Sequence, residues 1–271
     1  MADVQAPLIE TRALKKYFPV GDHSQLHAVD GINLKIYPGE TLGVVGESGC
    51  GKSTLGRTIL RLQEPTDGQI LYDGKDITKY NRRQMKQMRQ NMQLIFQDPY
   101  ASLDPRKSVV EIIAEYMIIN RTYPSKKEIY NYAAHLMDIV GLARRYANAY
   151  PHELDGGRRQ RIGIARALSL HPKFIVCDEP VSALDVSIQA QILNLLMDLQ
   201  DEMNLTYMFV THDLSVVKHI SNHIMVMYLG QCLELSTSDE LFERPLHPYT
   251  QALLSAIPEP DISMRSKEIK V

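Results

Sequence analysis

The sequence predicts an α/β fold in which a mainly parallel sheet is built around a phosphate-binding loop. Residues 46–54 read G-E-S-G-C-G-K-S-T and match the P-loop pattern G-x-x-x-x-G-K-[ST]. An apolar run at 42–45 predicts a buried strand entering this loop, and residues 55–62 predict a helix leaving it. From residue 173 onward strands and helices alternate, which is typical of parallel strands with helices on both faces of the sheet.

The segments on either side of the P-loop predict an antiparallel β subdomain. Apolar spacing indicates an edge strand at 8–14 and a second strand at 28–36. After the P-loop helix, residues 69–72 and the Asp73-Gly74 turn indicate a hairpin. A basic helix at 82–90 and a short apolar strand at 92–96 follow.

The composition then changes, and residues 98–151 require no strand. Helical spacing covers 109–119, and Ser125 with Glu128 forms a capping-box pattern for a second helix that Gly141 would close. We therefore assign 98–151 to an inserted helical subdomain. Residues 1–97 and 152–235 form the nucleotide-binding core, and 236–271 form a C-terminal extension whose tail, from Pro258, is expected to be loosely ordered.

The remaining elements of the core follow from the same patterns. Expected strands and helices lie, in chain order, at 173–177, 187–203, 207–210, 215–221, 223–228 and 232–235.

The composition excludes several classes of function. Thirty Lys and Arg against thirty-two Asp and Glu give a net charge of −2, so there is no excess positive field to attract nucleic acid. Three cysteines lie far apart and fall in no C-x-x-C pair, which favours a reducing compartment. No run approaches about eighteen apolar residues. We expect a soluble cytoplasmic protein that reaches a membrane only through a partner.

The P-loop residues are expected to bind the phosphates of ATP and its Mg²⁺ ion. Glycines allow successive N–H groups to point at one anion, and the following helix adds its positive end. Lys52 would bridge the β- and γ-phosphates, and the Ser53 hydroxyl would ligate Mg²⁺. The full predicted ATP-binding set within the loop is Gly46, Ser48, Gly49, Cys50, Gly51, Lys52, Ser53 and Thr54.

Two carboxylates end the strand at 173–177, at the edge of the sheet where ligands bind. This is the Walker B pattern. Asp178 would hold Mg²⁺ through water, and Glu179 would orient or deprotonate the water that attacks the γ-phosphate.

The motif L154-D-G-G-R-R-Q-R161 resembles the L-S-G-G-Q signature of ABC-type ATPases. Gln97 matches the Q-loop of that family, Ser182-Ala-Leu-Asp185 its D-loop, and His212 its switch histidine. The motifs occur in the order of the family, and the resemblance covers essentially the whole chain.

The resemblance implies a head-to-tail dimer in which the signature of one protomer closes over the ATP of the other. Asp155, Gly156, Gly157 and Asp185 would then contact the partner's ATP, while Glu179, His212 and Gln97 are implied to be catalytic, with Gln97 also a Mg²⁺ ligand. Tyr17 matches the aromatic residue that stacks on adenine, with Phe18 as the alternative.

The signature departs from the family pattern at two positions. Asp155 replaces a serine that donates to the γ-phosphate, and Arg158 replaces a glutamine. Asp is as good an N-cap as Ser, so the helix should form. Two unit charges about 4 Å apart cost roughly 4 kcal/mol at an effective dielectric near 20, and Arg158 and Arg159 would offset part of this. We hypothesise that this signature is impaired, whereas the Walker motifs remain competent opposite an intact one.

The C-terminal stretch 240–254, E-L-F-E-R-P-L-H-P-Y-T-Q-A-L-L, resembles the extension of ATPase subunits in dipeptide, oligopeptide and nickel importers. That resemblance implies a second ATPase subunit, two permease subunits at the cytoplasmic face of the membrane and, indirectly, a peptide-binding protein. The second ATPase subunit would form a heterodimer or, with a second copy, a homodimer. Some members carry an iron–sulfur cluster, but no cysteine follows Cys232, so none is expected.

The resemblance therefore implies, as the leading interpretation, an ATP-hydrolysing subunit of an importer for di- or oligopeptides. Three other functions stay open at this point. They are an importer of nickel or another solute, a soluble ABC ATPase of translation or DNA repair, and a module that binds ATP without hydrolysing it.

Overall fold

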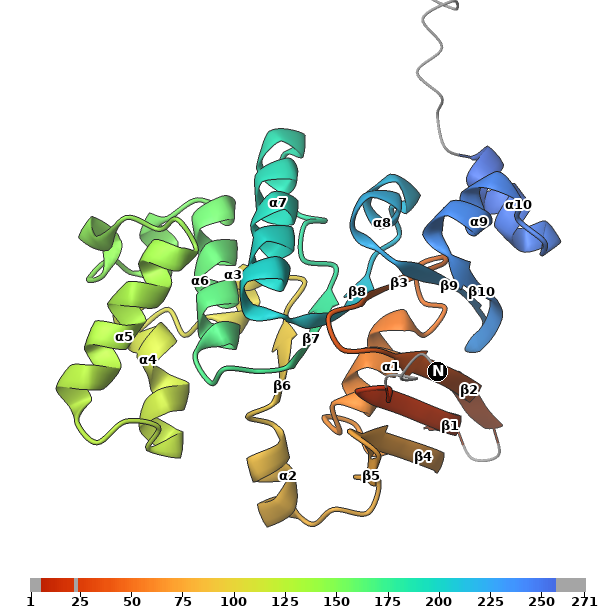
Figure 1. The fold of residues 1–271 in the computed structure, drawn as a ribbon, viewed down its shortest axis with the longest axis horizontal. Coiled ribbons are helices and arrows are strands. Elements are labelled where there is room, and N and C mark those ends of the chain that lie inside the picture. Colours follow the sequence, from red (N-terminus) through yellow and green to blue (C-terminus); the bar gives the residue numbers. More distant parts are fainter. Residues whose placement is uncertain (1–5, 22–23, 257–271) are drawn as a thin grey trace, which may run out of the picture.

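The computed structural model describes residues 6–21 and 24–256, and its central element is a six-stranded sheet in the order β10-β9-β3-β8-β7-β6 (Figure 1). Strands β9 to β6 run parallel and β10 is antiparallel to β9. The strands are β3 (Thr41–Val45), β6 (Met92–Ile95), β7 (Phe174–Asp178), β8 (Thr206–Val210), β9 (His223–Tyr228) and β10 (Gln231–Thr237). Every residue of β3, β7 and β8 is buried, as in a sheet covered on both faces. The predicted mainly parallel sheet is confirmed.

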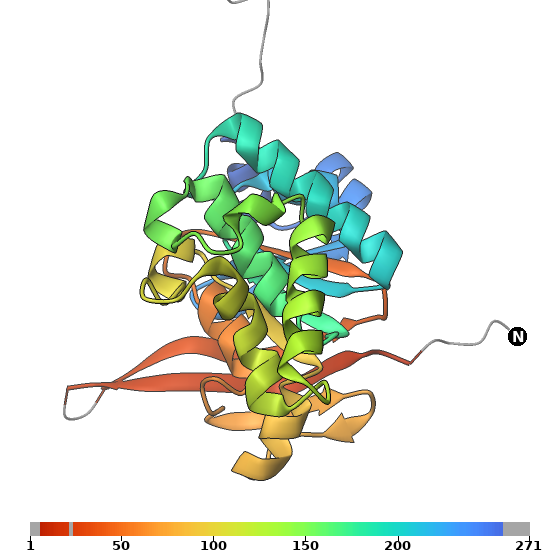
Figure 2. The same ribbon diagram turned by 90° about the vertical axis from the view of Figure 1, so that its left-hand side faces the viewer.

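The predicted antiparallel sheet is also confirmed, in the order β2-β1-β4-β5. Its strands are β1 (Ile9–Val20), β2 (Ser24–Ile36), β4 (Asp67–Tyr72) and β5 (Lys75–Asp76). Figure 2 shows β1 and β2 as a long hairpin that projects from the body of the molecule.

The prediction of an edge strand at 8–14 is wrong. Strand β1 lies between β2 and β4, and its backbone bonds to both. Leu14 is fully buried and the strand continues to Val20, so Lys15 and Lys16 lie within the strand and do not follow its end. The edges of this sheet are β2 and β5.

Helix α1 (Lys52–Ile59) lies between the two sheets (Figure 1). Leu55 and Ile59 are fully buried in one apolar cluster that contains residues of both sheets. The helix begins at Lys52 rather than at Leu55, directly after Gly51, and the P-loop therefore delivers its N-terminal N–H groups to the space above the sheet.

The opposite face of the parallel sheet is covered by helices that share a second cluster. They are α4 (Val109–Asn120), α5 (Lys126–Ile139), α6 (Gly156–Leu168), α7 (Val186–Met203) and α8 (Leu214–Ile220). Ser125 accepts a hydrogen bond from the Glu128 N–H, which is the N-cap half of the predicted capping box, and Gly141 has φ +67°, as expected for a residue that closes a helix. The predicted helical segment therefore packs directly on the core.

Shorter helices complete the chain. They are α2 (Arg82–Met88), α3 (Pro99–Ser102), α9 (Ser238–Glu243) and α10 (Pro248–Ser255), with 3₁₀ turns at Arg144–Tyr146 and Pro151–Glu153. Across residues 6–21 and 24–256, no helix has the length and apolar character needed to cross a bilayer. The tail predicted to be loosely ordered, from Pro258, lies outside the described residues.

Candidate nucleotide-binding site

The P-loop between β3 and α1 is folded tightly against its surroundings. Gly51 has φ +109°, and a Cβ there would lie 1.9 Å from the carbonyl oxygen of Ala28, so only glycine fits. Lys52 is 4% exposed, and its ammonium donates to the carbonyl oxygens of Gly46 and Glu47, both at 2.8 Å. These carbonyl oxygens hold the charge of Lys52 in the loop, where a phosphate would bind.

Asp178 at the end of β7 joins the Walker B strand to the P-loop helix. Its side chain accepts from the Ser53 hydroxyl at 2.6 Å and from the Arg57 guanidinium at 3.1 Å. Asp178 is 1% exposed, so this buried carboxylate has both a hydroxyl and a cation as partners. The two predicted Mg²⁺ ligands Ser53 and Asp178 are therefore adjacent, and their oxygen atoms are of the type that Mg²⁺ prefers.

Unlike Asp178, whose side chain bonds to the P-loop helix, Glu179 lines the pocket next to the P-loop. Its backbone is left-handed, with φ +48°, and its N–H donates to the Val210 carbonyl. The Gln97 amide donates to the Glu179 carboxylate at 3.0 Å, and Nδ1 of His212 lies 3.5 Å from the same oxygen. The structure thus brings together the three residues that the sequence marked as catalytic.

These groups line one pocket of about 440 Å³, in the range of small-molecule sites. Nine of the predicted site residues line it, namely Ser48, Gly49, Gly51, Lys52, Ser53, Thr54, Gln97, Glu179 and His212. Gly46 lies under the loop, bonded to Lys52. Cys50 is also buried, which raises the pKa of its thiol, so it stays neutral beside the ammonium.

The β1–β2 hairpin contributes three residues to this pocket, Phe18, Leu26 and Ala28. Phe18 is paired with Leu26, whereas Tyr17 is paired with His27 and so lies on the other face of the hairpin. The sequence did not mark Leu26 and Ala28 as site residues. Leu26 precedes the strand expected at 28–36, and the register shift between Lys16 and Tyr17, which lies opposite Ala28, is not visible in the sequence.

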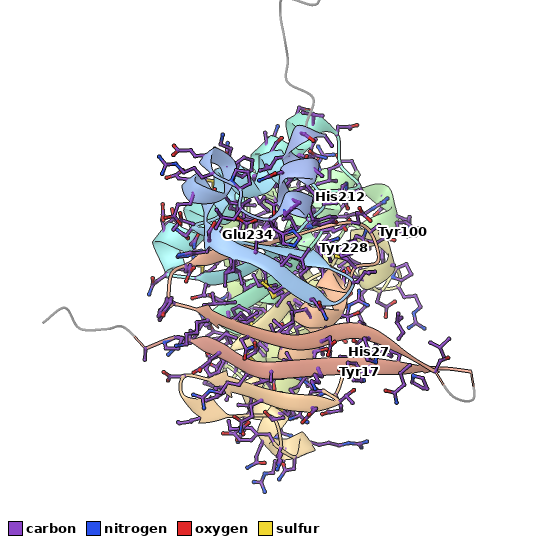
Figure 3. All side chains as sticks on the ribbon, turned by 90° about the vertical axis from the view of Figure 1, so that its right-hand side faces the viewer. Tyr17, His27, Tyr100, His212, Tyr228 and Glu234 are labelled. Atoms are coloured by element: carbon purple, nitrogen blue, oxygen red, sulfur yellow. The ribbon has the colours of Figure 1, made fainter. Side chains whose placement is uncertain are left out.

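Tyr17, the predicted adenine contact, already has partners (Figure 3). Its ring stacks on His27 at 3.9 Å between centroids, and its hydroxyl donates to Asp30. This hydrogen bond and burial raise the pKa of Tyr17 to about 12. The described lining of the pocket includes Phe18 and not Tyr17, which favours the alternative candidate.

Asp155 is the N-cap of α6 and accepts from the Arg158 N–H at 2.8 Å. The guanidinium of Arg158 forms an ion pair with the Asp155 carboxylate and lies 5.0 Å from the centre of the Tyr146 ring. Arg159 instead donates to the Pro151 carbonyl at 2.7 Å. Arg158 therefore offsets the charge of Asp155, as the sequence suggested, and Arg159 has another role.

The signature and D-loop residues are in contact with each other at the start of α6 and α7. A Cβ on Gly157 would lie 2.7 Å from the Ile188 side chain, and one on Gly156 would lie 3.1 Å from Leu184. Asp185 is the exposed N-cap residue of α7. Among the described residues that line the pocket, none belongs to this group.

Comparison with known proteins gives the family. A model described as "ABC transporter" matches residues 29–182, and one described as "Oligopeptide/dipeptide transporter, C-terminal region" matches 233–270. The chain belongs to the ABC transporter ATPase family. Such ATPases hydrolyse ATP to drive transport, and the chain is an ATP-binding component of this kind.

Relatives and solved structures agree with that assignment. The chain is 55% identical to the oligopeptide transport ATP-binding protein OppF of Bacillus subtilis, over 94% of this chain and 83% of the relative. It is 49% identical to the dipeptide transport ATP-binding protein DppF of Escherichia coli, over 100% and 82%. The dimeric post-hydrolysis state of the ATP-binding cassette MJ0796, bound to ADP and Pi, is similar with a TM-score of 0.78 and 29% identity, covering 85% of this chain and 98% of that one.

Proposed function

We propose that this ABC ATPase is the ATP-hydrolysing subunit of an importer for di- or oligopeptides, at the cytoplasmic face of the membrane. The peptide assignment is supported by the match of residues 233–270 to the C-terminal region of oligopeptide and dipeptide transporters and by the names of the relatives. The single observation that carries the ATPase chemistry is the pocket in which Lys52, Glu179 and His212 meet.

The P-loop would bind the phosphates of ATP. The N–H groups at the start of α1 and the charge of Lys52 face the pocket, and both favour an anion. Lys52 would leave the carbonyl oxygens of Gly46 and Glu47 and bond to the phosphates, exchanging two neutral acceptors for charged ones. Ser53, Asp178 and Gln97 would hold Mg²⁺, which neutralises phosphate charge when bound.

Glu179 would act as the general base. A water on the pocket side of its carboxylate attacks the γ-phosphorus and passes a proton to Glu179, while the bond from phosphorus to the β–γ bridging oxygen breaks and ADP leaves. Gln97 and His212 both lie against one oxygen of the carboxylate, so the carboxylate is oriented before the water binds. His212 would also contact the γ-phosphate.

Phe18 and Leu26 would form the adenine end of the site, because they are the paired side chains on the face of the hairpin that lines the pocket. We expect Phe18→Ala to weaken binding of a non-hydrolysed ATP analogue about tenfold, through loss of base stacking. Tyr17→Ala is the matched variant and should change the dissociation constant less. Calorimetric titration checks both, and a larger effect at Tyr17 would restore the prediction from sequence.

The signature group would serve a second ATPase subunit. Asp155, Gly156, Gly157 and Asp185 lie together yet outside the pocket of their own chain, which supports a role at the ATP of a partner. The similarity to a dimeric cassette supports the same arrangement. The partner would be a different subunit with an intact signature, or a second copy of this chain.

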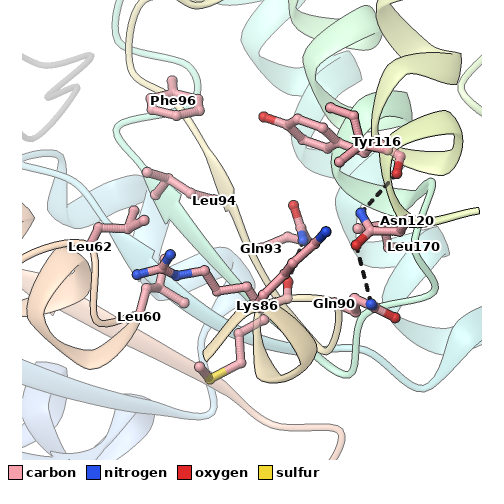
Figure 4. A pocket seen from close by; sticks show the side chains of 13 residues that line it. Leu60, Leu62, Lys86, Gln90, Gln93, Leu94, Phe96, Tyr116, Asn120 and Leu170 are labelled. Atoms are coloured by element: carbon pink, nitrogen blue, oxygen red, sulfur yellow. Dashed lines mark hydrogen bonds between the residues drawn. The ribbon is translucent and has the colours of Figure 1, made fainter. Parts of the chain in front are cut away.

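A groove of about 300 Å³ between the sheet and the helical segment would receive the permease (Figure 4). Leu62, Phe96 and Ile119 line it and are 49%, 36% and 55% exposed. Phe96 precedes Gln97, so a permease segment in this groove would lie next to a residue that holds Glu179. The groove wall is fixed by hydrogen bonds from Gln90 to Asn120 and from Asn120 to the Tyr116 carbonyl.

We expect Ile119→Asp to reduce copurification with the permease by at least about tenfold, because a buried unpaired charge costs several kcal/mol. ATP binding by the variant should be unchanged, since Ile119 lies outside the nucleotide pocket. Val20→Asp is the matched control for copurification, because Val20 is 51% exposed and lies outside the groove. Equal copurification of all three proteins would show that the permease docks elsewhere.

The proposed function is tested by transport. Proteoliposomes containing the permease subunits, this chain and its ATPase partner, with the binding protein added, should accumulate labelled di- or oligopeptides when supplied with ATP. Uptake of Ni²⁺ without peptide uptake would overturn the substrate class while leaving the ATPase chemistry intact.

A further inference from the structure

The C-terminal region of the chain contacts the P-loop through one side chain. Tyr249 lies in the first turn of α10, and its hydroxyl accepts a hydrogen bond from the backbone N–H of Glu47 at 3.4 Å. The two residues are 202 positions apart in the chain. Burial raises the pKa of the Tyr249 phenol, so it stays neutral and protonated at physiological pH. The H-P-Y-T motif of the extension thus contacts the loop that would bind phosphate.

Helix α10 is held in place from strand β10. The Glu234 carboxylate accepts from the N–H groups of Leu246 and His247, at 2.9 and 3.0 Å. His247 is the N-cap of the helix and accepts from the Tyr249 N–H at 3.0 Å. Glu234 therefore fixes the turn from which Tyr249 projects. Figure 3 labels Glu234, which lies in β10 opposite Val226 of β9.

Other contacts join the same region to the loop. The Tyr249 ring lies 4.7 Å from the ring of Tyr228, at the end of β9. In the turn between β9 and β10, the Gly230 N–H donates a hydrogen bond to the carbonyl oxygen of Cys50 at 2.9 Å. The P-loop is thus supported along its outer side by residues of the C-terminal quarter, while its inner side faces the nucleotide pocket.

We propose that Tyr249 is a positioning residue for ATP, through which the C-terminal region sets the affinity of the P-loop. Glu47, Ser48 and Gly49 are exposed, and the Glu47 carbonyl oxygen is held from within the loop, by the Lys52 ammonium and the Cys50 N–H. Tyr249 holds the Glu47 N–H from outside the loop, and this contact does not depend on Lys52, which would leave Glu47 when phosphate binds. A loop binds phosphate when its N–H groups already converge, and ordering each residue on binding costs free energy. By fixing Glu47 in advance, Tyr249 lowers that cost. The proposal rests on the nucleotide site proposed above.

The test removes only the hydroxyl. In the full chain, Tyr249→Phe should raise the dissociation constant of a non-hydrolysed ATP analogue about three- to tenfold, the range expected for one hydrogen bond. In the assembled transporter the KM for ATP should rise by a similar factor and kcat should fall by less. Tyr130→Phe, in α5, is the matched control and should bind as the wild type. Equal affinities for all three proteins would overturn the proposal.

A second variant separates positioning from general destabilisation. Glu234→Ala releases the turn before α10 and should weaken ATP binding by a similar factor. Adding Tyr249→Phe to this variant should then weaken binding little further, because both changes act through the same contact with Glu47. Multiplicative effects of the two changes would contradict the proposal, as would a fall in melting temperature that accounts for the loss. If the wild-type chain does not bind the analogue, the proposed nucleotide site fails instead.

Discussion

Glu179→Gln should lower steady-state ATP hydrolysis by about 10²–10⁴ while ATP still binds, because a general base contributes a factor of this size. The amide keeps the shape of the side chain but does not accept a proton from water. The neighbouring Asp178, which faces Ser53 and Arg57, is untouched. Phosphate release by the assembled transporter measures the loss, and calorimetry measures the retained binding.

The control for this change is Glu202→Gln, which removes an exposed carboxylate near the end of α7, away from the pocket. It should hydrolyse ATP at the wild-type rate. If Glu179→Gln retains even a tenth of that rate, the base is another group, and His212 is the first to examine because it lines the same pocket.

The sequence predicted most of this site because the chemistry is carried by local patterns. Three patterns each place a site residue at the carboxyl end of a strand. They are a glycine-rich turn, an apolar strand that ends in two acids, and a histidine that follows another strand. Parallel strands end at the same edge of the sheet, which puts Lys52, Glu179 and His212 on one side of it. They meet in one pocket because β3, β8 and β7 are neighbours in the sheet, and the local patterns alone do not give that strand order.

The hairpin was predicted less well because its geometry is not local. Strand β1 shifts register between Leu14 and Lys16 and again between Lys16 and Tyr17. Each shift can exchange the faces on which later side chains lie, and a period of two along the sequence does not reveal it. This is why Phe18 lines the pocket while Tyr17 stacks on His27. The strand expected at the edge lies inside the sheet for a different reason, because β4, which follows the P-loop helix, pairs with its second side.

Asp155→Ser should raise ATP hydrolysis by the chain alone at least about tenfold, because it removes a negative charge that would face the partner's γ-phosphate at a cost of up to roughly 4 kcal/mol. The structure lowers this repulsion energy, because Arg158 is paired with Asp155 and because the carboxylate is 58% exposed, so that solvent screens its charge. Asp201→Ser, which removes an exposed charge from α7, is the control and should have no effect.

Arg158 decides how this result is interpreted. If Arg158 neutralises Asp155, then Arg158→Gln alone should slow hydrolysis further, and the double variant Asp155→Ser with Arg158→Gln should be at least as active as Asp155→Ser. Wild-type turnover equal to that of Asp155→Ser would show that the ion pair already replaces the serine and that two copies suffice. If every variant stays inactive alone but the wild type hydrolyses ATP with a second subunit, the active site requires that subunit's signature, and the pair Asp155–Arg158 marks the non-hydrolysing half of an asymmetric dimer.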